Sequence, residues 1–313
     1  MIKRFSISDV NGLVRLYNES MREDPDFRPL NYEEFQYRYL ELPYETIALV
    51  SSSGSTIDGG IIADVDPLME KKFGRKISVV DLMVAKKDNF LEISKSLISA
   101  LEQSLKQLGV EEIQFHFVAE NMKDVQEVLF ASGFEQSRIW YYMERDVEQI
   151  DLPDLPSGFK WDHIRFRGKY ANARKWLECH NKAFETHYGM RPLRYEELKS
   201  YLFEESFDPT GYFGIYEIGK RRFVAQCSCE VDTKLNEYQM ASKGVIWTVG
   251  VLEEMRGRGF GKLLVMKAIN WLYSKGVKRA AIHVDSLNER AFNIYSNLGF
   301  KILRKRLFYS KTL

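Results

Sequence analysis

The chain has 313 residues, with 45 basic and 44 acidic side chains that leave a formal charge of +1. This balance excludes the strong field that draws basic proteins to nucleic acids or anionic membranes. No apolar run approaches the roughly 18–20 residues that cross a bilayer, and residues 1–10 lack the apolar core of a signal peptide. We therefore expect a cytoplasmic protein, long enough for two domains of ordinary size.

A segment near the start of the chain recurs in the second half. Residues 28–34 read RPLNYEE and residues 191–197 read RPLRYEE, and Asn18 and Asn181 precede them at the same separation. Further matches follow in the same order: 79–84 with 246–251, and 132–134 with 298–300. Ordered recurrence of this kind predicts a duplicated domain.

We place the two copies at residues 1–148 and 159–313, joined by a linker at 149–158. The linker contains two prolines and ends on a glycine, which suits an exposed connection. Each copy is expected to be a mixed α/β domain. Hydrophobic periodicity in the second copy predicts these elements in chain order: strands at 213–218, 222–231 and 245–251, a helix at 262–275, a strand at 280–284, a helix at 288–298, and a strand at 303–309 that closes the sheet of this copy.

The linking segment between the last long strand and the helix at 262–275 reads Arg256-Gly257-Arg258-Gly259-Phe260-Gly261. Glycines let the backbone approach a ligand closely. The helix start adds unpaired N–H groups and a positive dipole end, and arginines can bind oxyanions in a bidentate way. This combination predicts a phosphate or pyrophosphate site.

Together with Asn288, Tyr295 and the Leu-Gly-Phe at 298–300, this loop resembles the GNAT superfamily of CoA-dependent N-acyltransferases. The resemblance implies two tandem GNAT domains in the layout of mycothiol synthase-type proteins. It also implies that the strand before the loop splays from its neighbour, that the pantetheine arm inserts there, and that the loop binds the pyrophosphate. Acetyl-CoA is then the co-substrate, with no metal. The implied cofactor-binding residues are Val249, Val251, Arg256, Gly257, Arg258, Gly259, Phe260, Gly261, Lys262, Asn288 and Tyr295.

Two implied catalytic groups are the backbone N–H of Val249, as oxyanion donor, and the hydroxyl of Tyr295, as partner of the leaving thiolate. The less favoured role for Tyr295 is to anchor its helix beside Phe292, and Asn288 either bonds the pantetheine amides or caps the helix. The base is open. The position where GNAT enzymes often carry a strand glutamate is Val245 here, which leaves three candidates (Glu230, Asp232 and His283) or a chain of water molecules.

The first copy differs where the chemistry should lie. It reads Asn-Phe-Leu-Glu-Ile-Ser at 89–94 in place of the glycine loop, and Met122 and Leu129 stand where the second copy has Asn288 and Tyr295. We expect a degenerate, non-catalytic copy, with weak CoA binding left open. The three cysteines (Cys179, Cys227 and Cys229) are too few for a disulfide framework, and no metal site is expected at the Cys-x-Cys pair.

The predicted function is transfer of an acetyl group to an amine of a small molecule, or less favourably of a peptide or protein. The alternative is a non-catalytic CoA-binding sensor or scaffold. No nucleic-acid or membrane partner is expected, and the chain would be a monomer or homodimer. Residues that could line the acceptor site are Trp176, His187, Tyr188, Arg191, Tyr195 and Trp247, although ordinary helix packing is the favoured role for each of them taken singly. The basic residues at 301 and 304–306 are typical of a charged edge strand.

Overall fold

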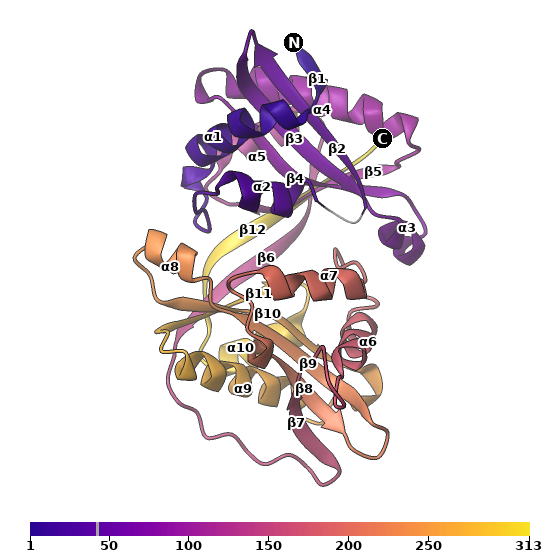
Figure 1. The fold of residues 1–313 in the computed structure, drawn as a ribbon, viewed down its shortest axis with the longest axis vertical. Coiled ribbons are helices and arrows are strands. Elements are labelled where there is room, and N and C mark those ends of the chain that lie inside the picture. The colour runs from indigo at the N-terminus through magenta and orange to yellow at the C-terminus, as the bar shows by residue number, and fades with distance from the viewer. Residues whose placement is uncertain (42–43) are drawn as a thin grey trace. The chain divides into compact units, whose positions relative to one another are not determined.

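The computed structural model describes residues 1–41 and 44–313, which separate into two compact units. Unit 1 comprises Met1–Trp140 together with Lys305–Leu313, and unit 2 comprises Tyr141–Arg304 (Figure 1). The compact units are not two consecutive stretches of the chain, because residues 305–313 belong to unit 1. The division of the duplicated sequence at 149–158 therefore remains a proposal about its two copies.

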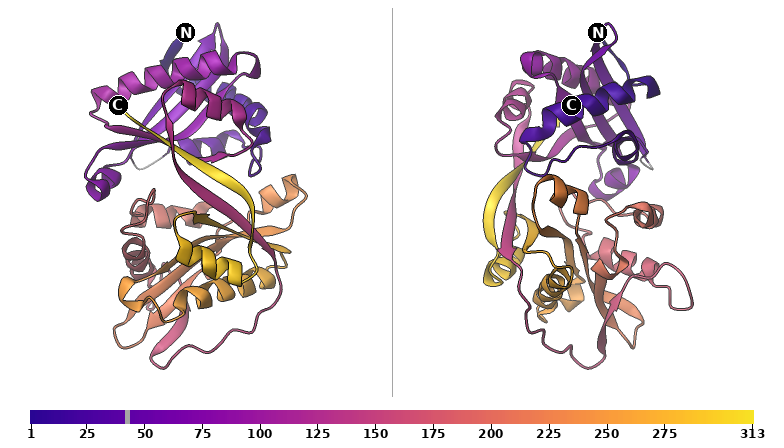
Figure 2. Two further views of the ribbon diagram at one scale, coloured as in Figure 1. Left: turned by 180° about the vertical axis from the view of Figure 1, so that it is seen from behind. Right: turned by 60° about the vertical axis from the view of Figure 1, so that its left-hand side comes forward.

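Unit 1 is a mixed sheet with helices on both faces. Its strands lie in the spatial order β1 (Ile2–Arg4), β2 (Glu45–Ser53), β3 (Thr56–Val65), β4 (Ile77–Ala85), β5 (Glu112–Ala119) and β12 (Lys301–Thr312). One face packs against α1 (Val10–Ser20) and α2 (Tyr32–Tyr39), and the other against α4 (Phe90–Gln107) and α5 (Lys123–Ala131), which come forward in the rear view of Figure 2. The short α3 (Pro67–Phe73) follows β3.

Unit 2 repeats this plan. Its strands lie in the order β7 (Phe159–His163), β8 (Tyr212–Glu217), β9 (Arg222–Glu230), β10 (Lys243–Val251), β11 (Arg279–Asp285) and β6 (Glu135–Asp146). Its helices are α6 (Ala173–Ala183), α7 (Tyr195–Ser200), α8 (Thr233–Tyr238), α9 (Phe260–Ser274) and α10 (Glu289–Asn297). A Cβ on Gly250 would meet Ala183 of α6, and one on Gly244 would meet Leu272 of α9, so these two helices cover opposite faces.

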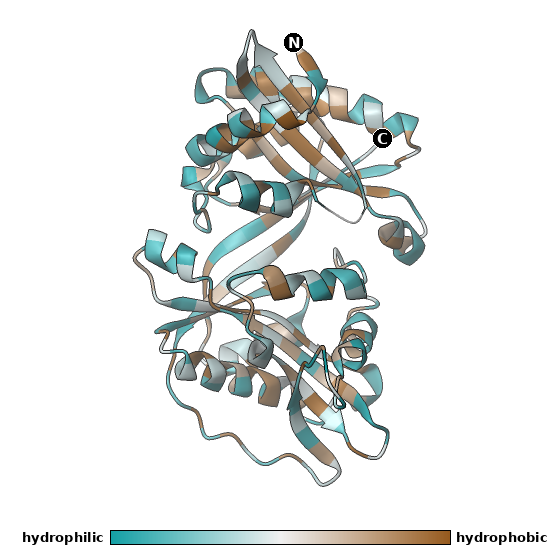
Figure 3. Cartoon of the chain, viewed as in Figure 1, coloured by the Kyte–Doolittle hydropathy of each residue, from teal (hydrophilic) through white to brown (hydrophobic). Residues whose placement is uncertain are grey.

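The predicted mixed α/β fold is confirmed. Apolar residues concentrate on the strands and on the inner sides of the helices, as the brown segments of Figure 3 show. In the described part of the chain, no helix combines the length and apolar character that crossing a membrane requires.

Each unit completes its sheet with a strand from the other copy of the sequence. From Arg306 to Thr312, β12 pairs antiparallel with β5, and Leu307 and Tyr309 enter the core of unit 1. In turn, Met143 of β6 enters the core of unit 2. The prediction that residues 303–309 close the sheet of the second copy is therefore wrong. Alternation of apolar residues fixes which side of a strand is buried, but not the edge it joins.

The duplicated motif makes the same contacts in both copies. Asn18 bonds the N–H and the carbonyl of Leu30 through its amide at 2.9 Å each. Asn181 does the same with Leu193 at 2.8 and 3.0 Å. The arginine of each motif bonds the glutamate six residues later. The recurrence in the sequence thus preserves a turn that fixes the segment after the first helix of each unit.

Candidate active site

Strands β10 and β11 separate partway along their length. Their parallel pairing runs from Lys243 to Ile246, whereas β10 continues to Val251 and stays paired with β9. The far half of β10 therefore has one edge without a strand partner among the described residues. An unpaired strand edge inside a domain offers backbone donors and acceptors to a ligand.

The direction of the backbone N–H groups follows from one hydrogen bond at the end of β10. The N–H of Leu252 donates to the carbonyl of Val224 on the β9 side at 3.0 Å. Because successive N–H groups of a strand point to opposite edges, those of Val249 and Val251 point away from β9. Both predicted residues thus present their N–H groups to the gap beside β11.

The glycine loop connects this strand to α9 through a turn of 3-10 helix at Glu253–Met255. Gly257 and Gly259 have φ of 85° and 81°, which side-chain-bearing residues rarely adopt. Apart from the two chain neighbours of each glycine, no described residue has an atom within 4 Å of a Cβ built at either position. The loop surface is therefore open to a ligand.

The N-terminus of α9 lies in the same place. Gly259 is its N-cap, and no described side chain caps its first turn. The first N–H groups of a helix then remain available to an anion, favoured by the helix dipole. The side chains of Arg258 and Lys262 are exposed beside them. Backbone donors, positive side chains and open glycines together fit a pyrophosphate.

Other residues of the loop hold it in position. Arg256 donates from Nε to the carbonyl of Val251 at 3.3 Å. Phe260 is 1% exposed and packs edge-to-face against Phe159. Gly261 faces the next helix, since a Cβ there would lie 3.4 Å from Ile294. These contacts tie the loop to the strand before it and to the core.

The helix α10 carries the other two predicted site residues. Asn288 is its N-cap, and its Oδ1 accepts the N–H of Ala291 at 3.1 Å. The capping role considered from the sequence is thus present, and the amide Nδ2 is not used by this bond. Tyr295 lies two turns further along, buried at 6% exposure among the core residues of unit 2.

The surroundings of Tyr295 keep its hydroxyl protonated. Burial raises the pKa of Tyr295 well above its ordinary value, and the nearby Cys227 thiol adds to the rise. The Sγ atoms of Cys227 and Cys229 lie 3.7 Å apart on β9. A buried, protonated phenol can donate a hydrogen bond to a developing anion.

The structure places a carboxylate directly opposite the position where the sequence lacks one. Glu230 of β9 is the register partner of Val245. Its Oε2 accepts the indole N–H of Trp247 at 2.9 Å, and its Oε1 accepts the hydroxyl of Ser206. The other two base candidates have different roles: Asp232 caps α8 by accepting the N–H of Leu235, and His283 stacks on Trp247.

Several predicted lining residues instead serve the packing of unit 2. Trp176 is 1% exposed, and its N–H donates to the carbonyl of Phe213. Arg191 binds Glu197 within the duplicated motif. Tyr195 lies beneath the guanidinium of Arg174, 3.8 Å from the ring centre. These contacts agree with the ordinary packing roles that the sequence left open for them.

A polar row on β9 and β10 was not singled out from the sequence. The hydroxyls of Ser228 and Thr248 lie 2.6 Å apart, and Thr248 donates to Oε1 of Gln226 at 3.1 Å. Gln226, Ser228 and Glu230 alternate along β9 and so share one face. The alternation of polar residues is visible in the sequence, but the position of these side chains beneath α6 is not.

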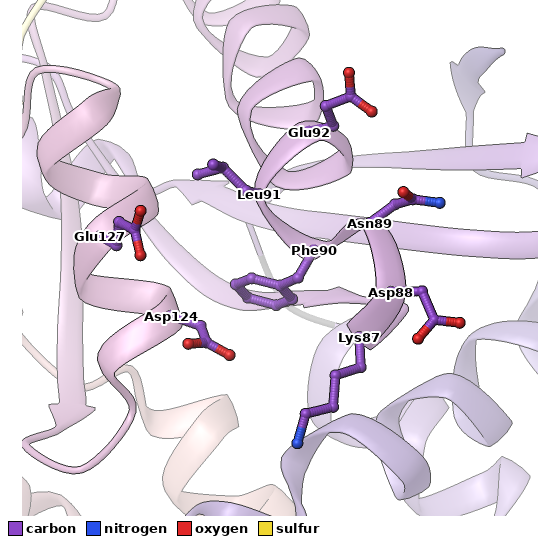
Figure 4. Close-up of a pocket in the computed structure, with 8 residues that line it drawn as sticks. All are labelled: Lys87, Asp88, Asn89, Phe90, Leu91, Glu92, Asp124 and Glu127. Atoms are coloured by element: carbon purple, nitrogen blue, oxygen red, sulfur yellow. The ribbon is translucent and has the colours of Figure 1, made fainter.

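The corresponding place in unit 1 has different chemistry. There α4 follows a turn of 3-10 helix at Lys87–Asn89, without glycines. A cavity of about 320 Å³ beside it is lined by the ring of Phe90 and by seven other residues, four of which are acidic (Figure 4). Its lining residues are Lys87, Asp88, Asn89, Phe90, Leu91, Glu92, Asp124 and Glu127. The carboxylates of Asp88, Glu92, Asp124 and Glu127 would repel a pyrophosphate.

Comparison with families of known proteins gives a match within the second copy of the sequence. Residues 173–300 match the Acetyltransferase (GNAT) family. This match covers the glycine loop and α10, and it indicates that residues 173–300 form an acetyltransferase domain of the GNAT type.

Two curated relatives share the similarity beyond that segment. The mycothiol acetyltransferase of Acidimicrobium ferrooxidans is 27% identical over 226 residues, which are 71% of this chain and 70% of that protein. The mycothiol acetyltransferase of Thermobispora bispora is 28% identical over 173 residues, 54% of this chain and 57% of that protein. The sequence similarity to the second relative thus spans little more than half of its length.

A solved structure shows the same fold over the whole chain. The tandem GNAT protein from the clavulanic acid biosynthesis pathway is 14% identical, with a TM-score of 0.73, and the match covers 100% of this chain and 98% of that one. The chain therefore has the tandem GNAT layout that the resemblance implied.

Proposed function

We propose that unit 2 transfers the acetyl group of acetyl-CoA to a primary amine of a small molecule. The observation that carries this proposal is the separation of β10 from β11 after Ile246, beside the uncapped start of α9. The separation offers a slot for the pantetheine arm, and the helix start offers donors for the pyrophosphate. The names of the mycothiol acetyltransferases support a small-molecule amine as acceptor.

The thioester would lie with its carbonyl oxygen against the N–H of Val249. When the amine nitrogen attacks the carbonyl carbon, the oxygen gains negative charge, and a fixed N–H stabilises that charge most in the transition state. One donor of this kind is typically worth about 2.7–4 kcal/mol. Val251 would bond the pantetheine further along the same edge, and Asn288 would do so through its Nδ2.

The pyrophosphate would be bound by the loop and the first turn of α9. Arg256, Arg258 and Lys262 supply positive charge, Gly257, Gly259 and Gly261 leave the backbone accessible, and Phe260 anchors the helix start. Collapse of the tetrahedral intermediate breaks the carbon–sulfur bond. Tyr295 would donate a hydrogen bond to the departing CoA thiolate, and the proton lost by the amine would finally reach the sulfur through water molecules, so that CoA leaves as free thiol.

Glu230 is the base that the geometry favours. It stands opposite Val245, next to the point where the two strands part, and its two oxygens are held by Trp247 and Ser206. Each carboxylate oxygen has a further lone pair for an amine proton. The proton lost by the attacking amine would pass to Glu230, directly or through a water molecule.

Calorimetry and a thiol-release assay on the full chain test this function. We expect one acetyl-CoA site, lost in the variant Arg256→Glu/Gly259→Asp, and release of CoA thiol with an amine panel. Binding that survives this double substitution would contradict the assignment of the site. Binding without thiol release for any amine would favour the alternative, a CoA-binding sensor or scaffold.

A further inference from the structure

Trp247 occupies an irregular position at the point where the strands part. The register of β10 on β9 passes from Ile246 opposite Cys229 to Thr248 opposite Ser228, so Trp247 is the extra residue of a β-bulge. Bulges re-aim side chains and are common beside active sites. The preceding residue, Ile246, is the last that pairs with β11.

The indole of Trp247 is fixed on two sides and open on the rest. Its N–H donates to Oε2 of Glu230 at 2.9 Å. Its ring lies nearly parallel to the imidazole of His283, with 4° between the planes and 5.9 Å between the centres. Even so, 52% of the residue is exposed. A large apolar surface is thus held rigidly while remaining accessible, as in binding sites that use aromatic anchors.

This surface lies between the two groups that the reaction needs. Val249, with its N–H facing the gap, is two residues further along β10, which is about 6–7 Å in an extended chain. Glu230 is bonded to the indole itself. An amine that reaches a thioester carbonyl at Val249 while giving its proton to Glu230 would therefore bring its carbon skeleton against Trp247.

We propose that Trp247 has two roles: it positions the Glu230 carboxylate through its N–H, and its exposed face selects the acceptor. This inference rests on the proposed function of unit 2. The acceptor class that fits is a primary amine whose neighbouring carbons are methylenes or part of a ring, without a carboxylate on the amine-bearing carbon. Such a carboxylate would lie close to Glu230, where like charges repel.

Two substitutions separate the roles. Trp247→Phe keeps an aromatic face but removes the N–H. We expect kcat to fall about tenfold, part of the 10²–10⁴ that a positioned base provides, with little change in the acceptor KM. Trp247→Ala removes the face as well, and the acceptor KM should rise about tenfold or more.

A matched control is available on α9. Trp271 also donates its indole N–H to a side chain, Thr210, at 2.9 Å. Trp271→Phe should leave kcat and KM unchanged. Acceptor choice is tested with phenylalaninamide against phenylalanine, which differ in the charge beside the amine. The wild type should prefer the amide at least about tenfold in kcat/KM.

The outcomes distinguish a failure of this inference from a failure of the proposed function on which it rests. Acetyl-CoA affinity, measured by calorimetry, should be the same in wild type and both Trp247 variants, which also shows that they fold. If the wild type turns over amines but Trp247→Phe keeps its kcat, the positioning role is wrong. An unchanged KM in Trp247→Ala, or equal use of the two acceptors, overturns the selecting role. A wild type that binds acetyl-CoA without turnover overturns the proposed function, and the inference with it.

Discussion

Arg306 binds Asp24, a residue 282 positions earlier in the chain, through both oxygens of the carboxylate at 2.8 and 2.9 Å. The guanidinium is 3% exposed and also bonds Asp26 and the carbonyl of Phe117. The sequence suggested a solvated edge strand for this basic segment. Instead, Arg306 is an internal anchor that fastens β12 into unit 1.

Replacing this anchor should destabilise unit 1. Arg306→Met would leave two carboxylates partly buried without their cation, and breaking such a pair typically costs about 3–5 kcal/mol. Urea unfolding of the full chain, followed by far-UV circular dichroism, should show an earlier first transition. Lys305→Met is the control, since the side chain of Lys305 is exposed. Equal midpoints for the two variants would show that the buried pair adds nothing to stability.

The positive φ of Gly259 should affect the affinity for acetyl-CoA as well as the stability of the fold. An alanine at φ of 81° is strained by about 1–2 kcal/mol, so the free loop of Gly259→Ala should relax into another shape. Recovering the binding shape then weakens acetyl-CoA binding roughly five- to thirtyfold.

Gly276 provides the comparison for that experiment. It has φ of 73° and open space around its Cβ position, but lies beyond the opposite end of α9. Gly276→Ala should lower the unfolding midpoint by a similar amount while leaving acetyl-CoA affinity unchanged in calorimetry. Equal losses of affinity in both variants would indicate a general effect on α9 and not a ligand-facing loop.

Tyr295→Phe should slow the reaction without weakening acetyl-CoA binding. The ring and its packing remain, and the hydrogen bond to the departing thiolate is lost, which should lower kcat by about 10²–10³. Because burial raises the pKa of Tyr295, the phenol stays protonated at and above neutral pH. The wild-type rate should therefore show no loss from phenol ionisation on approaching the ordinary tyrosine value of about 10. Tyr273→Phe, at an exposed position of α9, should behave as wild type.

Unit 1 should lose stability as the pH falls below neutral, and His116 should account for part of this loss. Burial lowers the pKa of His116 to about 4, while an unfolded histidine titrates near 6.5. Between these values the unfolded chain binds a proton that the folded chain does not, so stability falls as pH falls, by at most about 3 kcal/mol.

Urea midpoints between pH 7 and pH 4 measure this effect. His116→Gln removes the titrating ring and should flatten the profile relative to wild type across that range. His163→Gln, at an exposed position, should leave the profile unchanged. Parallel profiles for wild type and His116→Gln would show that other groups cause the acid sensitivity.

The sequence was sufficient for local features whose residues are neighbours in the chain. The glycine loop, its helix and the motif around Asn181 could be predicted because dihedral preferences and capping act over a few residues. The opposition of Glu230 and Val245 could not, because it depends on the register between two strands. The bulge at Trp247 shifts that register by one residue, and no alternation pattern reports such a shift.

The exchange of β6 and β12 between the two units could not be predicted for the same reason, because it depends on which strands pair. Residues 141–146 and 305–309 have strand-like patterns that fit either sheet equally well. What selects the edge is a set of distant contacts, such as Lys311 with Glu102 in unit 1 and Arg279 with Glu144 in unit 2. Dissecting the chain at the linker would remove a core strand from each unit, so the full chain is the proper material for binding experiments.

The exchange of strands also sets an order for biosynthesis. A ribosome makes residues 1–140 long before residues 305–313, yet unit 1 needs the latter to cover the open edge of β5. Domains usually fold as they emerge, the first one first. Here the edge of β5 in unit 1 stays unpaired until nearly all of unit 2 has been translated. An unpaired strand edge can associate with other chains, so a chaperone would be most useful during this interval.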